Sequence, residues 1–120
     1  MTARMRLGAL GEDAAAALLE KAGYRILARN HRCRLGEVDL IAEQGALLVF
    51  VEVRTRATAA FGAPAATVTP AKQRKIIAAA RDFLARWRGP ERGVRFDVVA
   101  VVDAPGGPLL EHLPGAFEAS

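Results

Sequence analysis

The sequence predicts a single α/β domain, in which a mixed β-sheet is flanked by helices. The 120 residues are the size of one ordinary domain, and a hydrophobic content of 52% can supply a core without disulfide or metal staples. The run Leu47 to Val53 is nearly continuously apolar, as expected for a central strand covered on both faces. A helix separates this run from a second apolar run, Val94 to Val102, which predicts that the two strands are parallel.

The first half of the chain predicts one helix and two strands before that central strand. Alanine-rich Leu10 to Ala22 has high helix propensity and one apolar stripe, and Gly23 ends it. Tyr24 to Cys33 and Glu37 to Glu43 are typical of strands. Gln44-Gly45 then predicts a hairpin turn into the central strand.

The second half predicts a loop, a helix and the last strand. Ala57 to Val68 is small and turn-prone, which indicates a loop. Thr69 is a good N-cap with Pro70 at the first helical position, and Gly89-Pro90 supplies the stop at the other end. The predicted order is therefore αβββαβ.

Domain organisation and compartment follow from composition. We expect a core over about residues 7–103 and a weakly ordered tail over residues 104–120, which opens with Pro105-Gly106-Gly107-Pro108. One cysteine cannot form an intrachain disulfide, and the first ten residues lack the apolar stretch of a signal peptide, so we expect a cytoplasmic protein. No apolar run is long enough to span a bilayer.

The charge balance favours a polyanionic partner. The net charge is +4, the pI is near 10, and fourteen of the seventeen basic residues are arginines, whose planar fork matches phosphate. Basic groups flank an acidic segment on both sides, which favours phosphate binding over the alternative of an ordinary solvated face. The candidate nucleic-acid-binding residues are Arg29, Arg32, Arg34, Arg56, Lys72, Arg74 and Lys75.

Three carboxylates are expected on one face of the sheet. Side chains alternate along a strand, so Glu37 and Asp39 share a face, as do Glu52, Arg54 and Arg56 on the next strand. A two-residue loop sets Glu37 opposite Glu52, and a four-residue loop sets Asp39 opposite Glu52. Both registers bring the acids to the same face.

Such a cluster requires compensation, because directly opposed like charges destabilise a sheet. A hard divalent cation such as Mg²⁺ would supply it, and Arg54 and Arg56 would supply part of it. The alternative is a solvated acidic face with arginine partners. The flanking apolar run favours a partly buried site.

Glu12 and Gln73 also lie on apolar helix stripes. Glu12 extends the inward face of the first helix, and Gln73 precedes the apolar face of the second at a spacing that aims it toward the sheet. The alternatives are an acid favoured by the helix dipole for Glu12 and an ordinary first-turn polar residue for Gln73.

Four motifs in this order resemble the YraN-like family of small bacterial proteins. They are Gly11-Glu12, Gly36-Glu37-Val38-Asp39, Val51-Glu52-Val53-Arg54 and Lys72-Gln73-Arg74, and the similarity covers roughly residues 7–102. That family is similar to the PD-(D/E)XK nuclease superfamily, near the archaeal Holliday junction resolvases. The resemblance implies a restriction-endonuclease-like αβββαβ core.

The resemblance also implies a function. Asp39 and Glu52 would bind Mg²⁺ or Mn²⁺, with the Val53 carbonyl as a third ligand, and Glu12 would match the first-helix acid. Glu37 would support the ligands, and Gln73 would orient the nucleophile or a phosphate. The implied activity is metal-dependent endonucleolytic hydrolysis of DNA, with branched or structured DNA as a candidate substrate.

Two departures from the superfamily pattern keep other functions open. Arg54 stands where a lysine is usual and stays protonated, so it fits a phosphate clamp and not a general base. Val38 replaces the proline before the first acid. The alternatives are a catalytically weak or inactive nucleic-acid-binding module and a protein-interaction scaffold, and resolvase-like relatives suggest a homodimer by analogy.

Overall fold

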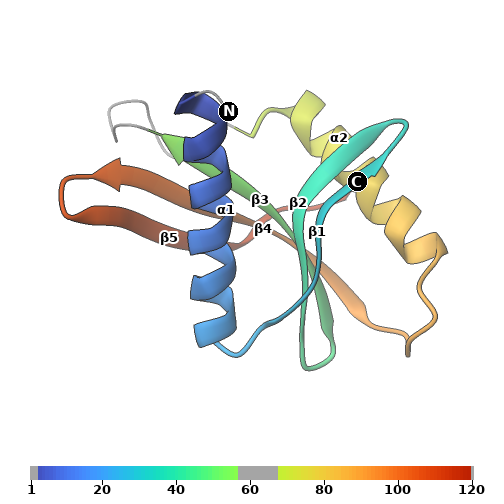
Figure 1. The fold of residues 1–120 in the computed structure, drawn as a ribbon. Helices are drawn as coiled ribbons and strands as arrows, with labels where there is room; N and C mark the ends of the chain where they lie inside the picture. Colours follow the sequence, from blue (N-terminus) through green and yellow to red (C-terminus); the bar gives the residue numbers. More distant parts are fainter. Residues whose placement is uncertain (1–2, 57–67, 120) are drawn as a thin grey trace.

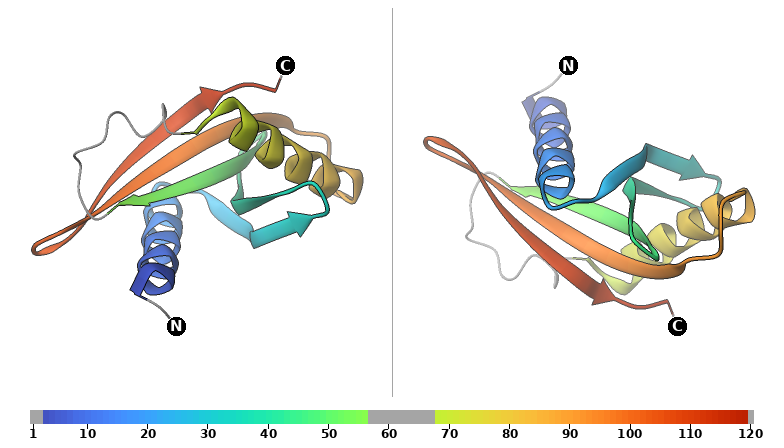
Figure 2. Two further views of the ribbon diagram at one scale, coloured as in Figure 1. Left: turned by 90° about the horizontal axis from the view of Figure 1, so that it is seen from above. Right: turned by 90° about the horizontal axis from the view of Figure 1, so that it is seen from below.

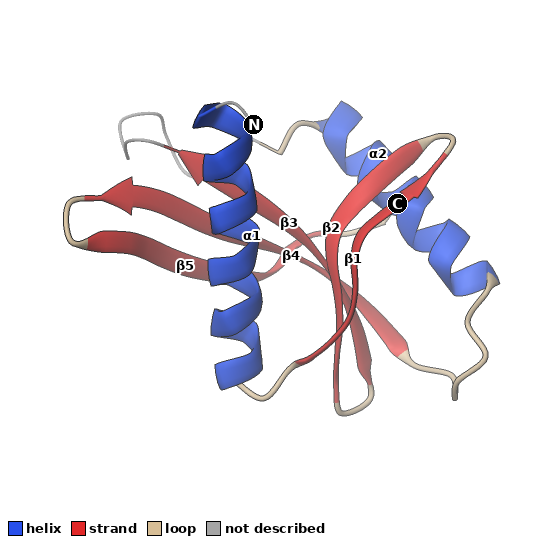
Figure 3. Ribbon diagram, viewed as in Figure 1, coloured by secondary structure: helices blue, strands red, loops and turns tan. Residues whose placement is uncertain are grey.

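The computed structural model describes residues 3–56 and 68–119, which form five strands and two helices (Figures 1 and 3). The sheet has the order β1-β2-β3-β4-β5. The α/β class and the mixed sheet are therefore confirmed. The elements are α1 (Ala3–Lys21), β1 (Arg25–Cys33), β2 (Gly36–Gln44), β3 (Leu47–Arg56), α2 (Pro70–Ala85), β4 (Gly93–Ala104) and β5 (Gly107–Phe117).

The sheet is antiparallel except at its centre. β1 pairs with β2, and β2 with β3, in the antiparallel sense, whereas β3 and β4 are parallel, as the connection through α2 predicted. Figure 2 shows α1 and α2 on opposite faces of the sheet. The central strands are thus covered on both sides.

Two apolar layers form the core, one under each helix. On the α1 side, Leu19 packs with Val51 and Val99, and on the α2 side Phe50 packs with Ile76; all of these side chains are buried. Alternation along β3 sends Val51 to one layer and Phe50 to the other. This double burial explains why the β3 sequence is almost continuously apolar.

Helix α2 has the cap that the sequence predicted. Thr69 has extended backbone angles, and its hydroxyl oxygen accepts a hydrogen bond from the Lys72 N–H at 3.2 Å, with Pro70 in the first turn. The helix ends at Ala85, four residues before Gly89. The predicted loop over residues 57–68 lies outside the described residues except for Val68, which is buried.

Two element boundaries differ from the prediction. Helix α1 begins at Ala3 instead of Leu10, because the residues before Leu10 include good helix formers that the apolar stripe did not reveal. The β2–β3 turn is Gly45-Ala46 instead of Gln44-Gly45, since Gln44 pairs with Leu47. Over the described residues, neither helix combines the length and apolarity needed for a membrane crossing.

The expected weakly ordered tail over residues 104–120 is wrong. Residues Gly107–Phe117 form β5, which pairs antiparallel with β4 along most of its length. Pro105 and Gly106 make the hairpin turn, with Ala104 paired to Gly107. The proline- and glycine-rich segment therefore closes a hairpin, and the folded domain extends well beyond residue 103.

Candidate metal centre

The candidate site lies where β2 and β3 separate. The two strands pair from Gln44–Leu47 to Leu40–Val51, which is the register that aligns Asp39 with Glu52. One step further, the Asp39 carboxylate accepts the Val53 N–H at 2.8 Å, which satisfies a backbone donor at this point. Figure 1 shows the strands diverging here, toward the end of the sheet where both helices begin.

Asp39 and Glu52 form a close pair of carboxyl groups. Glu52 is 3% exposed, and its side chain shares a hydrogen bond with Asp39. Burial, together with that bond and the Asp39 charge, raises the pKa of Glu52 to about 9. In the absence of a cation, the pair therefore holds a proton at neutral pH.

One oxygen of this pair has no hydrogen bond. Glu52 Oε2 is buried and lacks a hydrogen-bond partner among the described residues, and Lys72 Nζ lies 3.5 Å away. A buried acceptor without a donor costs about 1–3 kcal/mol. Lys72 therefore supplies charge to this oxygen from 3.5 Å, but the oxygen still lacks a hydrogen-bond donor among the described residues.

A divalent cation fits this site. Among the described residues, no group of three or more His, Cys, Asp or Glu side chains is arranged to hold a metal. Mg²⁺, however, is usually bound through one or two carboxylates and keeps several waters. Asp39 and Glu52 suit such a water-rich shell and not a cage built wholly from protein.

Two further acids approach the pair. Glu12, on α1, is half-buried, and its pKa is raised by burial first and then by the Asp39 charge, while a hydrogen bond from Asn30 opposes the shift. Glu37 forms an ion pair with Arg32 across the β1–β2 hairpin at 2.5 Å. Glu12 is therefore the third acid near the centre, and Glu37 is paired with Arg32.

The basic residue closest to Glu52 comes from α2. Lys72 and Arg54 both lower the pKa of Glu52, and Lys72 has the larger effect. Arg54 is half-buried, and its Nε lacks a hydrogen-bond partner within the described part of the chain. Arg56, at the end of β3, is half-exposed. The sequence assigned the compensating role to the arginines and missed the contact of Lys72.

Gln73 makes a different contact from the one expected. Its amide nitrogen donates to the Val68 carbonyl at 2.9 Å, so it fastens the backbone before α2. With Arg74 and Arg81 it lines a separate pocket of about 350 Å³. The structure therefore does not bring Gln73 and Arg74 to the carboxylate pair.

The remaining basic residues divide between two places. Arg29 forms an exposed ion pair with Asp13 at 2.6 Å. Next to the carboxylates, a pocket of about 410 Å³ is lined by four basic side chains, Arg32, Arg34, Lys72 and Lys75, together with Cys33, Leu35, Gly36 and Glu37. This pocket brings together four of the seven predicted phosphate-binding residues, and Arg29, Arg56 and Arg74 do not line it.

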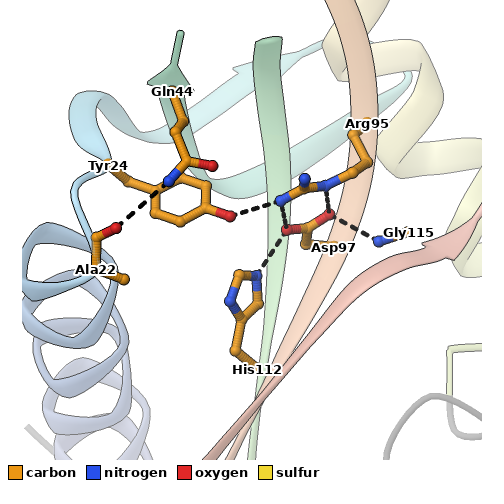
Figure 4. Close-up of polar contacts among 7 residues, drawn as sticks. All are labelled: Ala22, Tyr24, Gln44, Arg95, Asp97, His112 and Gly115. Atoms are coloured by element: carbon orange, nitrogen blue, oxygen red, sulfur yellow. Dashed lines mark hydrogen bonds and ion pairs between the residues drawn. The ribbon is translucent and has the colours of Figure 1, made fainter.

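A second polar cluster occupies the opposite face, and the sequence missed most of it (Figure 4). Asp97 is fully buried and accepts hydrogen bonds from Arg95 at 2.8 Å, His112 at 2.7 Å and the Gly115 N–H at 3.0 Å. Arg95 also donates to the Tyr24 hydroxyl at 2.7 Å. His112 and Gly115 fall in the segment that the sequence predicted to be a weakly ordered tail, so their contacts with Asp97 were not expected.

Comparisons with known proteins identify one family. A model of the uncharacterised protein family UPF0102 matches residues 11–101, which confirms the YraN-like resemblance. A UPF0102 protein of Anaeromyxobacter dehalogenans is 52% identical over 115 residues, covering 96% of this chain and 86% of that protein. UPF0102 proteins of Geobacter sulfurreducens (52% identity; 93% and 88% covered) and Symbiobacterium thermophilum (51%; 95% and 98%) are similar over equally long segments.

Proposed function

Given that the chain belongs to the UPF0102 family, we propose that it is a metal-dependent nuclease that hydrolyses phosphodiester bonds in DNA. The proposal rests on the site and on the superfamily resemblance, since the family description assigns no activity. Its expected cofactor is Mg²⁺ or Mn²⁺, and its expected partner is nucleic acid.

The observation that carries the proposal is the Asp39–Glu52 pair. Holding a nearly fully buried carboxyl group against a second one costs stability, and the Lys72 ammonium at 3.5 Å offsets only part of that cost. Such an arrangement is typical of groups kept for their chemistry. A cation that replaced the shared proton would satisfy both groups at once.

The residues around the pair have distinct roles in this proposal. Asp39 and Glu52, with the Val53 carbonyl, would hold the cation, and Glu12 would bind water of its shell from α1. The bound cation would lower the pKa of a water molecule and neutralise charge that develops on the phosphate. Lys72 and Arg54 would each hold a phosphate oxygen and stabilise that charge.

Cleavage assays with matched variants test the proposal. Labelled linear, single-stranded, flapped and four-way DNA are incubated with Mg²⁺, Mn²⁺ or chelator. Wild type should cleave only with metal, and Asp39→Asn and Glu52→Gln should abolish cleavage while Asp103→Asn and Glu111→Gln, which change exposed acids, leave it intact. Equal cleavage by all five proteins would exclude the carboxylate pair as the active site.

One observation favours a second candidate function, a nucleic-acid-binding protein without catalysis. Arg54 cannot act as a general base, and its guanidinium would bind a phosphate oxygen equally well without any reaction. Calorimetric titration with Mn²⁺ separates the two functions. Heat of binding that Glu52→Gln removes supports the nuclease, whereas DNA binding without any metal binding supports the second candidate.

A further inference from the structure

An exposed leucine stands at the tip of the β1–β2 hairpin. Cys33 pairs with Gly36, so Arg34 and Leu35 form the two-residue turn between the strands. Neither residue has the positive φ that would require glycine or asparagine, so the turn itself does not dictate which residue stands at position 35. Leu35 is 71% exposed. Since single exposed leucines are common, its surroundings must decide whether it has a role.

Those surroundings are strongly basic. Leu35 lines the 410 Å³ pocket together with Arg34 and Lys75, and within the described residues neither cation has a carboxylate partner. Arg32 uses its Nε for Glu37 and is itself 73% exposed. An apolar side chain ringed by available cations matches a ligand that carries both phosphates and apolar faces, which describes a nucleic acid.

The pocket is linked to the carboxylate pair through Lys72. Lys72 lines it, and the same ammonium group lies 3.5 Å from Glu52. Leu35 precedes Asp39 by four residues, and an extended chain of that length spans at most about 13 Å. Because base pairs are spaced by about 3.4 Å along a duplex, the leucine lies within about four base steps of the proposed reaction site.

The hairpin tip is held in place against α2. A Cβ at Gly36 would overlap the backbone carbonyl of Lys75, so the two segments are in direct backbone contact. The Arg32–Glu37 ion pair also ties the two strands of the hairpin together just before the turn. Leu35 is therefore presented by a supported turn and not by a free loop.

We propose that Leu35 is an apolar wedge that inserts beside a base wherever the base stack of a duplex is interrupted, while the pocket binds the adjacent phosphates. Apolar side chains, leucine among them, insert between base steps in this way in other proteins. A continuous duplex buries its base faces, but an end, a gap or a branch exposes them. The proposal rests on the proposed function, because it defines which nucleic acid that site receives.

Two equally exposed leucines provide the test. Leu35→Ser removes the wedge, and Leu109→Ser is the control, because Leu109 is 65% exposed near the β4–β5 turn, at the opposite end of the molecule from the β1–β2 hairpin in Figure 1. Leu35→Met keeps an apolar tip. Binding is measured in chelator to a continuous duplex and to the same duplex with one gap, with 2-aminopurine beside the gap to report unstacking.

Wild type, Leu109→Ser and Leu35→Met should bind the gapped duplex more tightly and increase 2-aminopurine fluorescence. Leu35→Ser should lose about tenfold in affinity for the gapped duplex, a factor within the range expected for an apolar side chain that is no longer buried. Its affinity for the continuous duplex should be unchanged. In Mg²⁺, wild-type cuts should fall within about four nucleotides of the gap.

The outcomes separate this proposal from the proposed function. Metal-dependent cleavage with a gap preference that survives in Leu35→Ser would overturn the wedge and leave the nuclease standing. A Leu35-dependent gap preference without metal binding would support the wedge and overturn the nuclease. If wild type neither binds either duplex in chelator nor cleaves it in Mg²⁺, both are wrong. Circular dichroism and urea unfolding of each variant show that a loss of preference does not come from misfolding.

Discussion

Replacing Asp97 with asparagine is expected to destabilise the protein strongly without touching the metal centre. Asparagine has nearly the same shape as aspartate but no charge. Its amide NH₂ would replace a carboxylate oxygen that accepts hydrogen bonds, so two donors would then face each other. The donors to Asp97 are Arg95, His112 and the Gly115 N–H, at 2.7–3.0 Å. The change therefore leaves Arg95 without its counter-charge beside a fully buried position.

The expected loss is about 3 kcal/mol of the free energy of unfolding. Removing one partner from a buried ion pair typically costs about 3–5 kcal/mol. We take the lower end, because the Arg95 side chain is 26% exposed and water can replace part of the lost interaction. Against a total stability of about 5–15 kcal/mol for a domain, this loss is large.

The loss should also depend on pH. Burial alone would raise the pKa of Asp97, but the bonds from Arg95, Gly115 and His112 more than offset it and hold that pKa below the ordinary value of 3.8. A lowered carboxyl pKa stabilises the fold above the unfolded-state pKa, and this stabilisation disappears as the pH falls through the folded-state pKa. Wild type and Asp97→Asn should thus differ fully at neutral pH and converge in acid.

Urea unfolding followed by circular dichroism measures the effect. With a slope of about 1–3 kcal/mol per molar urea, a loss of about 3 kcal/mol lowers the midpoint by roughly 1–3 M. Asp103→Asn, an exposed acid on the same strand, is the control and should leave the midpoint unchanged. If Asp97→Asn unfolds at the wild-type midpoint at neutral pH, the cluster in Figure 4 does not hold the sheet as described.

Three further predictions follow from single contacts. In chelator, wild-type stability should fall as the pH rises above about 5, since burial and Asp39 raise the pKa of Glu52 from 4.5 to about 9 and the folded state holds one extra proton in that range. Glu52→Gln should flatten this profile in urea unfolding at a series of pH values, and a wild-type profile without slope would contradict the shared proton. Thr69→Ala should cost about 1 kcal/mol in the same assay, because the Lys72 N–H loses its cap; an unchanged midpoint would show that the cap is dispensable. Phe50→Ala should cost about 3–5 kcal/mol, because it empties a fully buried site between β3 and α2, and a loss below 1 kcal/mol would mean that the core collapses around it.

Local patterns predicted the centre of the fold well. The start of α2 could be predicted because Thr69 and Pro70 cap the helix through residues close to them in the sequence. The burial of β3 could be predicted because a strand covered on both faces is apolar at nearly every position. The meeting of Asp39 and Glu52 was predicted from alternation alone, which holds in either register. The position of the turn, at Gly45-Ala46, could not be predicted without knowing that Gln44 pairs with Leu47.

Long-range partners were the part that the sequence could not supply. Lys72 contacts Glu52 from a different element. The position of Lys72 along α2 does not predict where the ammonium group of its flexible side chain lies. Gln73 lay on the expected stripe but bonds Val68, five residues back, because a local backbone acceptor was closer than the sheet. His112 and Gly115 serve Asp97 from fifteen and eighteen residues away. The spacing of Leu110 and His112, two residues apart, is the one local pattern here that is typical of a strand, and Pro114 interrupts that pattern.

The position of these partners has a consequence for synthesis on the ribosome. Gly115 follows Asp97 by eighteen residues, so at about 5–20 residues per second the partner amide emerges roughly 1–4 s after the carboxylate. During that interval Asp97 has Arg95 beside it but lacks its His112 and Gly115 donors, and the edge of β4 along Val98 and Val99 is open to other chains. Nascent chains of this protein are therefore exposed to aggregation until translation passes the final hairpin.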